Sequence, residues 1–255
     1  MEFSPLVYVV APVIVFAGYV MFGISGFGAT IIIIPILAHF LPLKFVVPLL
    51  VLLDLGAAIM MRANKATAAL DKAEFRWMLP FMLAGMAAGA YLLKVAPESW
   101  LMLGLGLFVA GNAAANLLRS KGAGGGTAGS IAHAWGAPIS LLGGIGSSLF
   151  GTGGSIYAIY VARRIRDPGA MRATMSTIIS VSVVVRIFVF SIAGLLLKIE
   201  LGIGALALML FMASGLLLGM RLHSRMNADQ LRRVVYVLLL VSGSSLALRA
   251  LSLMG

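Results

Sequence analysis

The sequence contains no cysteine and few charged residues among its 255 positions. The absence of thiols excludes disulfides, cysteine-based catalysis and cysteine-ligated metals, although it says nothing about the compartment. Charged residues make up 11% of the chain, whereas an ordinary soluble domain has about a quarter. Hydrophobic residues make up 61%, so the composition is that of a protein with several membrane-spanning helices.

Acidic residues are also scarce, with 8 Asp and Glu against 19 Lys and Arg. The basic residues lie between apolar runs rather than on one continuous face, so they indicate membrane topology and no nucleic-acid partner is expected. They gather in four stretches, at 62–76, 119–121, 163–172 and 221–233. The positive-inside rule places these four stretches in the cytoplasm and the poorly charged connections at 41–44, 94–98 and 194–203 outside.

The apolar runs predict an all-α polytopic membrane protein. Two runs beside glycine clusters, at 29–41 and 154–162, are shorter than the roughly 20 residues that a spanning helix needs. They predict two glycine-broken helical hairpins, at 5–41 and 134–162, that enter and leave on the same side. Six full spans are predicted at 45–61, 77–93, 99–118, 170–193, 204–220 and 234–252. This arrangement places both termini outside.

Each half then consists of one hairpin and three spans, so the halves are predicted to be inverted repeats, as in many secondary transporters. The first repeat covers 1–119 and the second 131–255, joined by a glycine-rich cytoplasmic linker at 120–130. Gly26, Gly28 and Thr30 align with Gly151, Gly153 and Ser155 at a spacing of 125. Gly85 and Gly89 align with Gly215 and Gly219 at a spacing of 130.

The hairpin tips are the predicted substrate site. Each short helix would begin inside the membrane, where its unsatisfied N–H groups and partial positive charge suit an anion. Glycine lets a ligand approach the backbone closely, and a following hydroxyl can cap the helix or donate a hydrogen bond. The predicted site consists of Gly26, Phe27, Gly28, Ala29, Thr30, Gly151, Thr152, Gly153, Gly154 and Ser155. The alternative is that these glycines only allow close helix packing.

Two ionisable residues lie well inside predicted spans, where a charge is costly and marks a functional candidate. Asp54 lies near the middle of its span and is the candidate for proton coupling; a structural hydrogen bond or a salt bridge to an arginine is the alternative. Arg186 is the candidate for binding the anion, because a guanidinium can contact two oxygens at once. The pairing partner of Arg186 is left open.

The chain resembles the sulfite exporter TauE/SafE family of bacterial membrane proteins. The resemblance rests on "GISGFGAT" near the N-terminus, "GSSLFGTGGS" at the start of the second half, the basic linker and the duplicated layout. It implies a transporter or exporter of small sulfur-containing anions, such as sulfite or organosulfonates, in the cytoplasmic membrane.

An enzyme is not expected. The stretch "GISG" matches the GxSG of rhomboid proteases, but no histidine lies mid-span to activate Ser25. An anion channel is the stronger alternative, since glycine tips and arginines can also line a pore. No two histidines have metal-ligand spacing, and neither a metal nor a cofactor is expected. The expected partners are a small anion and the lipid bilayer, with a homodimer left open.

Overall fold

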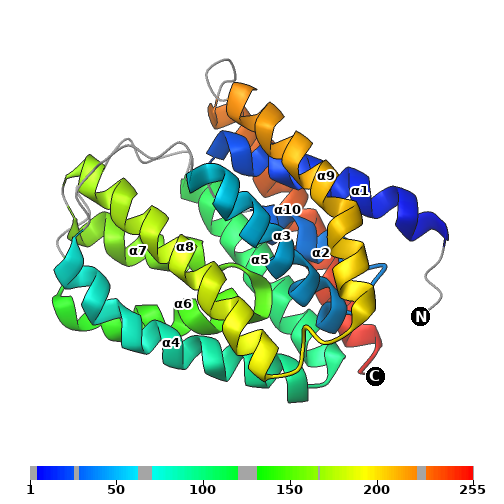
Figure 1. Cartoon of the computed structure of the whole chain (residues 1–255), viewed down its shortest axis with the longest axis horizontal. Coiled ribbons are helices and arrows are strands. Elements are labelled where there is room, and N and C mark those ends of the chain that lie inside the picture. Colours follow the sequence, from blue (N-terminus) through cyan, green and yellow to red (C-terminus); the bar gives the residue numbers. More distant parts are fainter. Residues whose placement is uncertain are drawn as a thin grey trace. The chain divides into compact units, whose positions relative to one another are not determined.

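The computed structural model describes residues 5–25, 29–62, 71–119, 131–165, 167–222 and 228–254, and over these residues the chain forms helices and no strands. The α-helices are α1 (Pro5–Ser25), α2 (Ala29–Leu37), α3 (Leu43–Arg62), α4 (Lys72–Val95), α5 (Glu98–Arg119), α6 (Gly136–Phe150), α7 (Gly153–Arg164), α8 (Pro168–Ile192), α9 (Ile199–Leu222) and α10 (Ala228–Ser252) (Figure 1). A 3-10 turn, η1 (His133–Trp135), precedes α6. The all-α prediction is confirmed, and helices occur at both hairpins and all six predicted spans.

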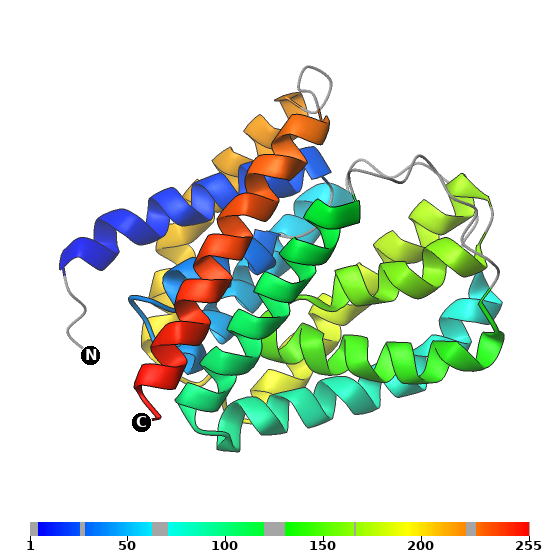
Figure 2. The ribbon, with the colours of Figure 1, turned by 180° about the vertical axis from the view of Figure 1, so that it is seen from behind.

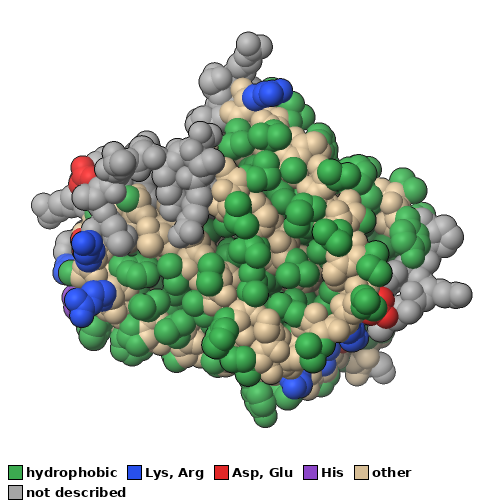
Figure 3. Space-filling model, viewed as in Figure 1, with side chains coloured by type: hydrophobic (Ala, Val, Ile, Leu, Met, Phe, Trp, Pro, Cys, Tyr) green, Lys and Arg blue, Asp and Glu red, His purple; other side chains and the backbone are tan. Residues whose placement is uncertain are grey.

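Helix lengths agree with a polytopic membrane protein. Within the described residues, α1, α3, α4, α8, α9 and α10 are each long and apolar enough to cross a membrane. By contrast, α2 and α7 have 9 and 12 residues, too few to cross about 30 Å of hydrocarbon. Hydrophobic side chains are spread over the described part of the face shown in Figure 3, among backbone and small polar groups. Examples such as Phe188 and Leu210, 67% and 77% exposed, are of the kind that contacts lipid.

The helices gather into two compact units. Unit 1 consists of Met1–Val46, Ala96–Gly126 and Gly204–Gly255, and so contains α1, α2, α5, α10 and most of α9. Unit 2 consists of Val47–Val95 and Thr127–Ile203, and so contains most of α3 together with α4, α6, α7 and α8. Each unit combines helices from both halves of the sequence. The predicted repeats, 1–119 and 131–255, are therefore not separate packing units, and their boundaries stay a prediction.

In unit 2, α4 packs closely against α6 through glycine. Gly85 faces the carbonyl of Leu141, and Gly89, one turn later, faces the carbonyl of Ile145. A methyl group at either glycine would overlap these backbone atoms, so the two helices approach as closely as backbones can. Because residue numbers rise together along both helices, α4 and α6 run parallel.

In unit 1, α9 packs against α1 in the same way. Gly215 faces the carbonyl of Phe16, and Gly219 faces the carbonyl of Val20. Gly215 and Gly219 are the glycines that align with Gly85 and Gly89 of α4 at a spacing of 130. The residues whose carbonyls they face are 125 positions apart in the two contacts, which is the spacing of the hairpin motifs. The fourth helix of each sequence half therefore packs on the hairpin of the other half through matching atoms.

A second glycine contact in unit 1 joins α5 and α10. A Cβ at Gly106 would meet the carbonyl of Gly243 and the N–H of Ala247, and a Cβ at Gly243 would meet the carbonyl of Gly106 and the N–H of Ala110. The contact is therefore reciprocal, as at a local two-fold axis. Figure 2 shows that the two helices run antiparallel, with the C-terminal end of α10 beside the start of α5.

Candidate functional site

The tip of the second hairpin, residues 147–155, is fully described and lies in unit 2. Helix α6 ends at Phe150, and the next residue, Gly151, adopts the left-handed conformation with φ 66°. The Gly151 N–H donates to the Ser147 carbonyl at 3.0 Å, and the Thr152 N–H donates to the Gly146 carbonyl at 3.2 Å. The Gly151 bond is that of an αL C-cap, which favours glycine at the left-handed position. The chain then turns directly into α7.

Helix α7 begins without a side-chain cap. The Thr152 hydroxyl donates to the Gly146 carbonyl at 3.2 Å, and the Ser155 hydroxyl donates to the Thr152 carbonyl at 2.8 Å. Both hydroxyl protons are thus used on backbone carbonyls, so a role for Thr152 and Ser155 as anion donors stays a prediction. Among the described residues, no hydrogen bond uses the N–H groups of Gly153 and Gly154. The first two N–H groups of α7 remain available to a ligand.

The two glycines that begin α7 differ in their surroundings. A Cβ at Gly153 would lie 2.7 Å from the Gly143 carbonyl and 2.7 Å from the Ser147 Cβ, so packing alone requires glycine there. A Cβ at Gly154 would meet only Ile179, at 3.8 Å, which is ordinary contact. Close packing therefore explains Gly153 but not Gly154.

Buried hydroxyl groups gather around this tip. The Ser147 and Ser182 hydroxyls are hydrogen-bonded to each other at 2.8 Å, which links α6 to α8. The hydroxyls of Ser148 and Tyr157 are fully buried and make no well-formed hydrogen bond to any other described residue. The Tyr157 hydroxyl nevertheless lies near enough to Ser182 and Arg186 to interact with both. A buried hydroxyl without a hydrogen bond is costly, so the tip offers polar groups that an anion could satisfy.

The two charged candidates meet in unit 2. Arg186 Nη1 of α8 lies 3.3 Å from Asp54 Oδ2 of α3, with side chains 3% and 14% exposed. The guanidinium also lies 6.0 Å from the centre of the Phe190 ring. Arg186 follows Ser182 by one helical turn on the same face of α8. The ion pair is therefore next to the tip, and the salt bridge to an arginine that was considered for Asp54 is present.

The first hairpin provides less of the predicted site. Gly26, Phe27 and Gly28 lie outside the described residues, as does the linker at 120–130. Ala29 and Thr30 begin α2 in unit 1 and are buried, 2% and 6% exposed. The remaining predicted site residues, including Arg186 and Asp54, belong to unit 2.

A polar cluster that the sequence analysis missed joins the base of the second hairpin to α4. Glu74, 6% exposed, accepts hydrogen bonds from the Arg164 Nε at 2.5 Å and the Tyr160 hydroxyl at 2.6 Å. His133 Nδ1 lies 3.2 Å from the same carboxylate, and its ring stacks on Trp77. In the sequence, Glu74 lies within the basic stretch 62–76, which predicted topology only. The cluster fixes both ends of the hairpin to one helix.

The described residues contain no group of three His, Asp or Glu side chains that could hold a metal ion. The polar groups described at the second tip are helix N–H groups, hydroxyls and one buried ion pair. Groups of this kind can bind and orient a small oxyanion.

Residues 10–246 match the model of the family described as Sulfite exporter TauE/SafE. The protein called "Probable inner membrane transporter protein TsaS" of Comamonas testosteroni is 27% identical over 203 residues, which cover 78% of this chain and 81% of that protein. No solved structure matches the chain.

Proposed function

The chain belongs to the sulfite exporter TauE/SafE family, and from this premise we propose that it is a secondary transporter that moves a small sulfur oxyanion across the inner membrane by alternating access. It is a membrane transporter of the sulfite or sulfonate type and not an enzyme. The similarity to a probable inner membrane transporter and the six long apolar helices support a multi-pass protein of the inner membrane. The positive-inside rule favours both termini outside.

The observation that carries the proposal is the start of α7. The N–H groups of Gly153 and Gly154 are not used by any other described residue. The buried Tyr157 hydroxyl makes no well-formed hydrogen bond to a described residue, and the Arg186 guanidinium lies one turn beyond Ser182. A sulfite or sulfonate group has several acceptor oxygens and negative charge, so it can satisfy all three kinds of donor. In the proposed complex the anion lies at the second tip, between the start of α7 and Arg186.

Coupling to protons follows from the ion pair. While Asp54 is ionised, its carboxylate occupies one side of the Arg186 guanidinium, 3.3 Å away. Protonation of Asp54 removes that competing charge, so the guanidinium can turn to the anion oxygens. In this mechanism one proton enters with the anion, and release of the proton restores the ion pair as the anion departs.

Alternating access requires two halves that can exchange roles, and the glycine contacts support such a relationship. The α4 contact in unit 2 and the α9 contact in unit 1 use matching glycines and matching carbonyls. The α5 and α10 helices, each the last helix of its sequence half, are antiparallel and contact each other reciprocally. Inverted repeats require such equivalent helices to point in opposite directions.

The test is flux into proteoliposomes of sulfite, sulfate and ethanesulfonate, with and without a pH gradient. We expect saturable flux of sulfite or ethanesulfonate that responds to the gradient, and its loss in Arg186→Gln. Arg163→Gln, which removes an exposed arginine of α7, is the matched control and should transport normally. Asp54→Asn should change the pH dependence.

Three outcomes would contradict parts of the proposal. If folded protein transports none of the sulfur anions, sulfur oxyanions are excluded as its substrates. Unitary currents would favour a channel over a carrier. An unchanged pH profile in Asp54→Asn would exclude Asp54 from coupling.

A further inference from the structure

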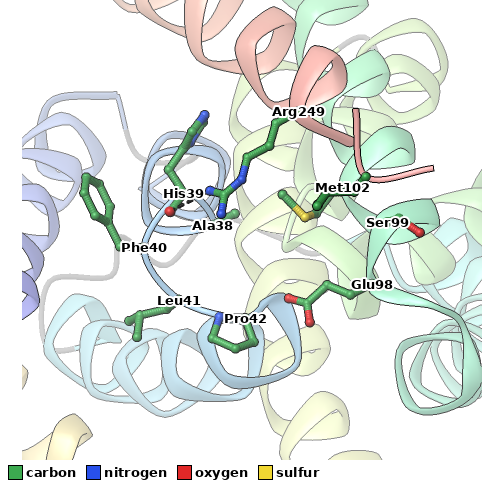
Figure 4. A pocket seen from close by; sticks show the side chains of 10 residues that line it. Ala38, His39, Phe40, Leu41, Pro42, Glu98, Ser99, Met102 and Arg249 are labelled. Atoms are coloured by element: carbon green, nitrogen blue, oxygen red, sulfur yellow. Dashed lines mark hydrogen bonds between the residues drawn. The ribbon is translucent and has the colours of Figure 1, made fainter. Parts of the chain in front are cut away.

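A cavity with two charged residues in its wall lies wholly within unit 1. Its volume is about 390 Å³, and it lies between the end of the first hairpin, the start of α5 and the end of α10 (Figure 4). This volume suits a small ligand. Its walls include two charged side chains of opposite sign, Arg249 and Glu98. None of its residues belongs to the proposed anion site.

The positive group of the cavity is held in place by the backbone. Arg249 Nη1 donates a hydrogen bond of 2.6 Å to the carbonyl of His39, just beyond the end of α2. Figure 4 shows the guanidinium extending from α10 toward His39 at the cavity wall. One of its five N–H groups is used in this contact, and the position of the charge is fixed.

The negative group is held in a similar way from the other side. Glu98, the first residue of α5, accepts a hydrogen bond of 2.7 Å from the N–H of Leu43 through its Oε1. This bond caps the start of α3. The side chain points into the cavity in Figure 4, and a carboxylate has further lone pairs to offer a ligand.

The two charges share a cavity but do not neutralise each other. None of the ion pairs among the described residues joins Arg249 to Glu98. Each side chain is instead held by a backbone group, so the cavity presents a fixed positive site and a fixed negative site.

The histidine in the wall is committed to other partners. His39 Nδ1 lies 2.8 Å from the Pro35 carbonyl, which can only accept, so Nδ1 carries a proton. In the neutral imidazole, Nε2 is then an acceptor, and it lies 3.1 Å from the Ser245 hydroxyl, which can donate to it. His39 therefore forms part of the wall, and the ligand charge is met by Arg249 and Glu98.

We propose that this cavity binds a small zwitterion, with its oxyanion at Arg249, its ammonium group at Glu98 and its short hydrocarbon spacer against Met102 and Leu253. A simple anion would be attracted by Arg249 and repelled by Glu98, and a simple amine would meet the reverse, so only a ligand with both charges gains at both ends. Free aminoalkyl sulfonates and the ethanolamine phosphodiester headgroup of a lipid share this chemistry. The proposal is independent of transport at the hairpin tip.

The experiment is isothermal titration of the full chain in phosphatidylglycerol nanodiscs, which contain no amine headgroup. The probes are 2-aminoethanesulfonate, glycerophosphoethanolamine, ethanesulfonate and ethylamine. The first two are zwitterions from the two sources, and the last two each lack one charge. We expect at least one zwitterion to bind about tenfold more tightly than either single-charge probe, since each charge-assisted contact contributes about that factor. The zwitterion that binds identifies the source.

Two substitutions remove charge while keeping the backbone contacts. Arg249→Gln retains an N–H for the His39 carbonyl, and Glu98→Gln retains an oxygen for the Leu43 N–H. Arg249→Gln should weaken zwitterion binding about tenfold. Glu98→Gln should weaken it similarly while leaving ethanesulfonate binding unchanged or tighter. Glu200→Gln, an exposed acid outside the cavity, is the control.

Repeating the titrations with the Arg186→Gln variant distinguishes binding in this cavity from binding at the hairpin tip. Arg186 lies in unit 2, so its substitution should not alter the preference for zwitterions. Ethanesulfonate binding as tightly as 2-aminoethanesulfonate and glycerophosphoethanolamine would overturn the proposal. Zwitterion binding that is unchanged in folded Arg249→Gln and Glu98→Gln would do the same, as would no binding of either zwitterion.

Discussion

Replacing either partner of the Arg186–Asp54 ion pair should lower the free energy of unfolding more than replacing any exposed charged residue. At 3.3 Å, two unit charges attract with about 5 kcal/mol at an effective dielectric constant of about 20. Removing one partner of a buried pair costs about 3 to 5 kcal/mol, because the remaining charge stays in a poor solvent. We therefore expect Asp54→Asn and Arg186→Gln each to lower the free energy of unfolding by about 3 kcal/mol. The double substitution leaves no charge behind and should cost less than the sum of the two.

The assay is thermal unfolding followed by tryptophan fluorescence, since the chain has three tryptophans and no cysteine for a thiol dye. A loss of 3 kcal/mol corresponds to a fall of about 6 to 12 °C in the melting midpoint. Flux measured on the same three variants separates structure from function. If Arg186 binds the anion, the double variant recovers stability but not transport. Single variants that melt within about 2 °C of the wild type, or strictly additive losses, would refute the reasoning.

Four further predictions concern glycines. Gly154→Ala should leave the melting midpoint unchanged, because its Cβ has room, yet reduce flux if the anion contacts this turn; normal flux would move the site elsewhere. Gly153→Ala should destabilise by about 1 to 3 kcal/mol through overlap with Gly143 and Ser147, so only its melting curve is informative. Gly151→Ala should cost about 1 to 2 kcal/mol because φ is 66°; no loss in thermal unfolding would argue against the left-handed C-cap. Gly219→Ala should destabilise by about 1 to 3 kcal/mol through overlap with the Val20 carbonyl, whereas Gly202→Ala on the same helix, with nothing within 4 Å, should be neutral in the same assay.

The helices could be predicted from sequence because each depends on neighbours along the chain. Membrane length and apolar composition predict a span without knowledge of its partners, and short runs beside glycine predicted α2 and α7. Helix ends were less accurate. The predicted span at 77–93 became Lys72–Val95, since polar residues in the first turn of a membrane helix carry no hydropathy signal.

The site could be predicted only in part. Because a charge within a membrane span is costly, Asp54 and Arg186 could each be identified from the sequence. Their contact could not, because they are 132 positions apart and meet only through the packing of α3 against α8. The Glu74 cluster and the Arg249 cavity escaped prediction for a related reason. Each is assembled from at least three separate segments, and charged residues at span ends look in sequence like topology signals.

The exchange of partners between the two halves has a consequence for biosynthesis. The first hairpin leaves the ribosome early, but Gly23 of α1 packs on the backbone of Leu216, Gly219 and Met220 in α9, which is made about 190 residues later. At about 5 to 20 residues per second, this partner arrives some 10 to 40 seconds after the hairpin. During that interval α2, with only 9 residues, is too short to cross the membrane on its own. The insertion machinery or the lipid must therefore shelter the hairpin, and a nascent chain arrested before α9 should present it to a membrane-quality protease.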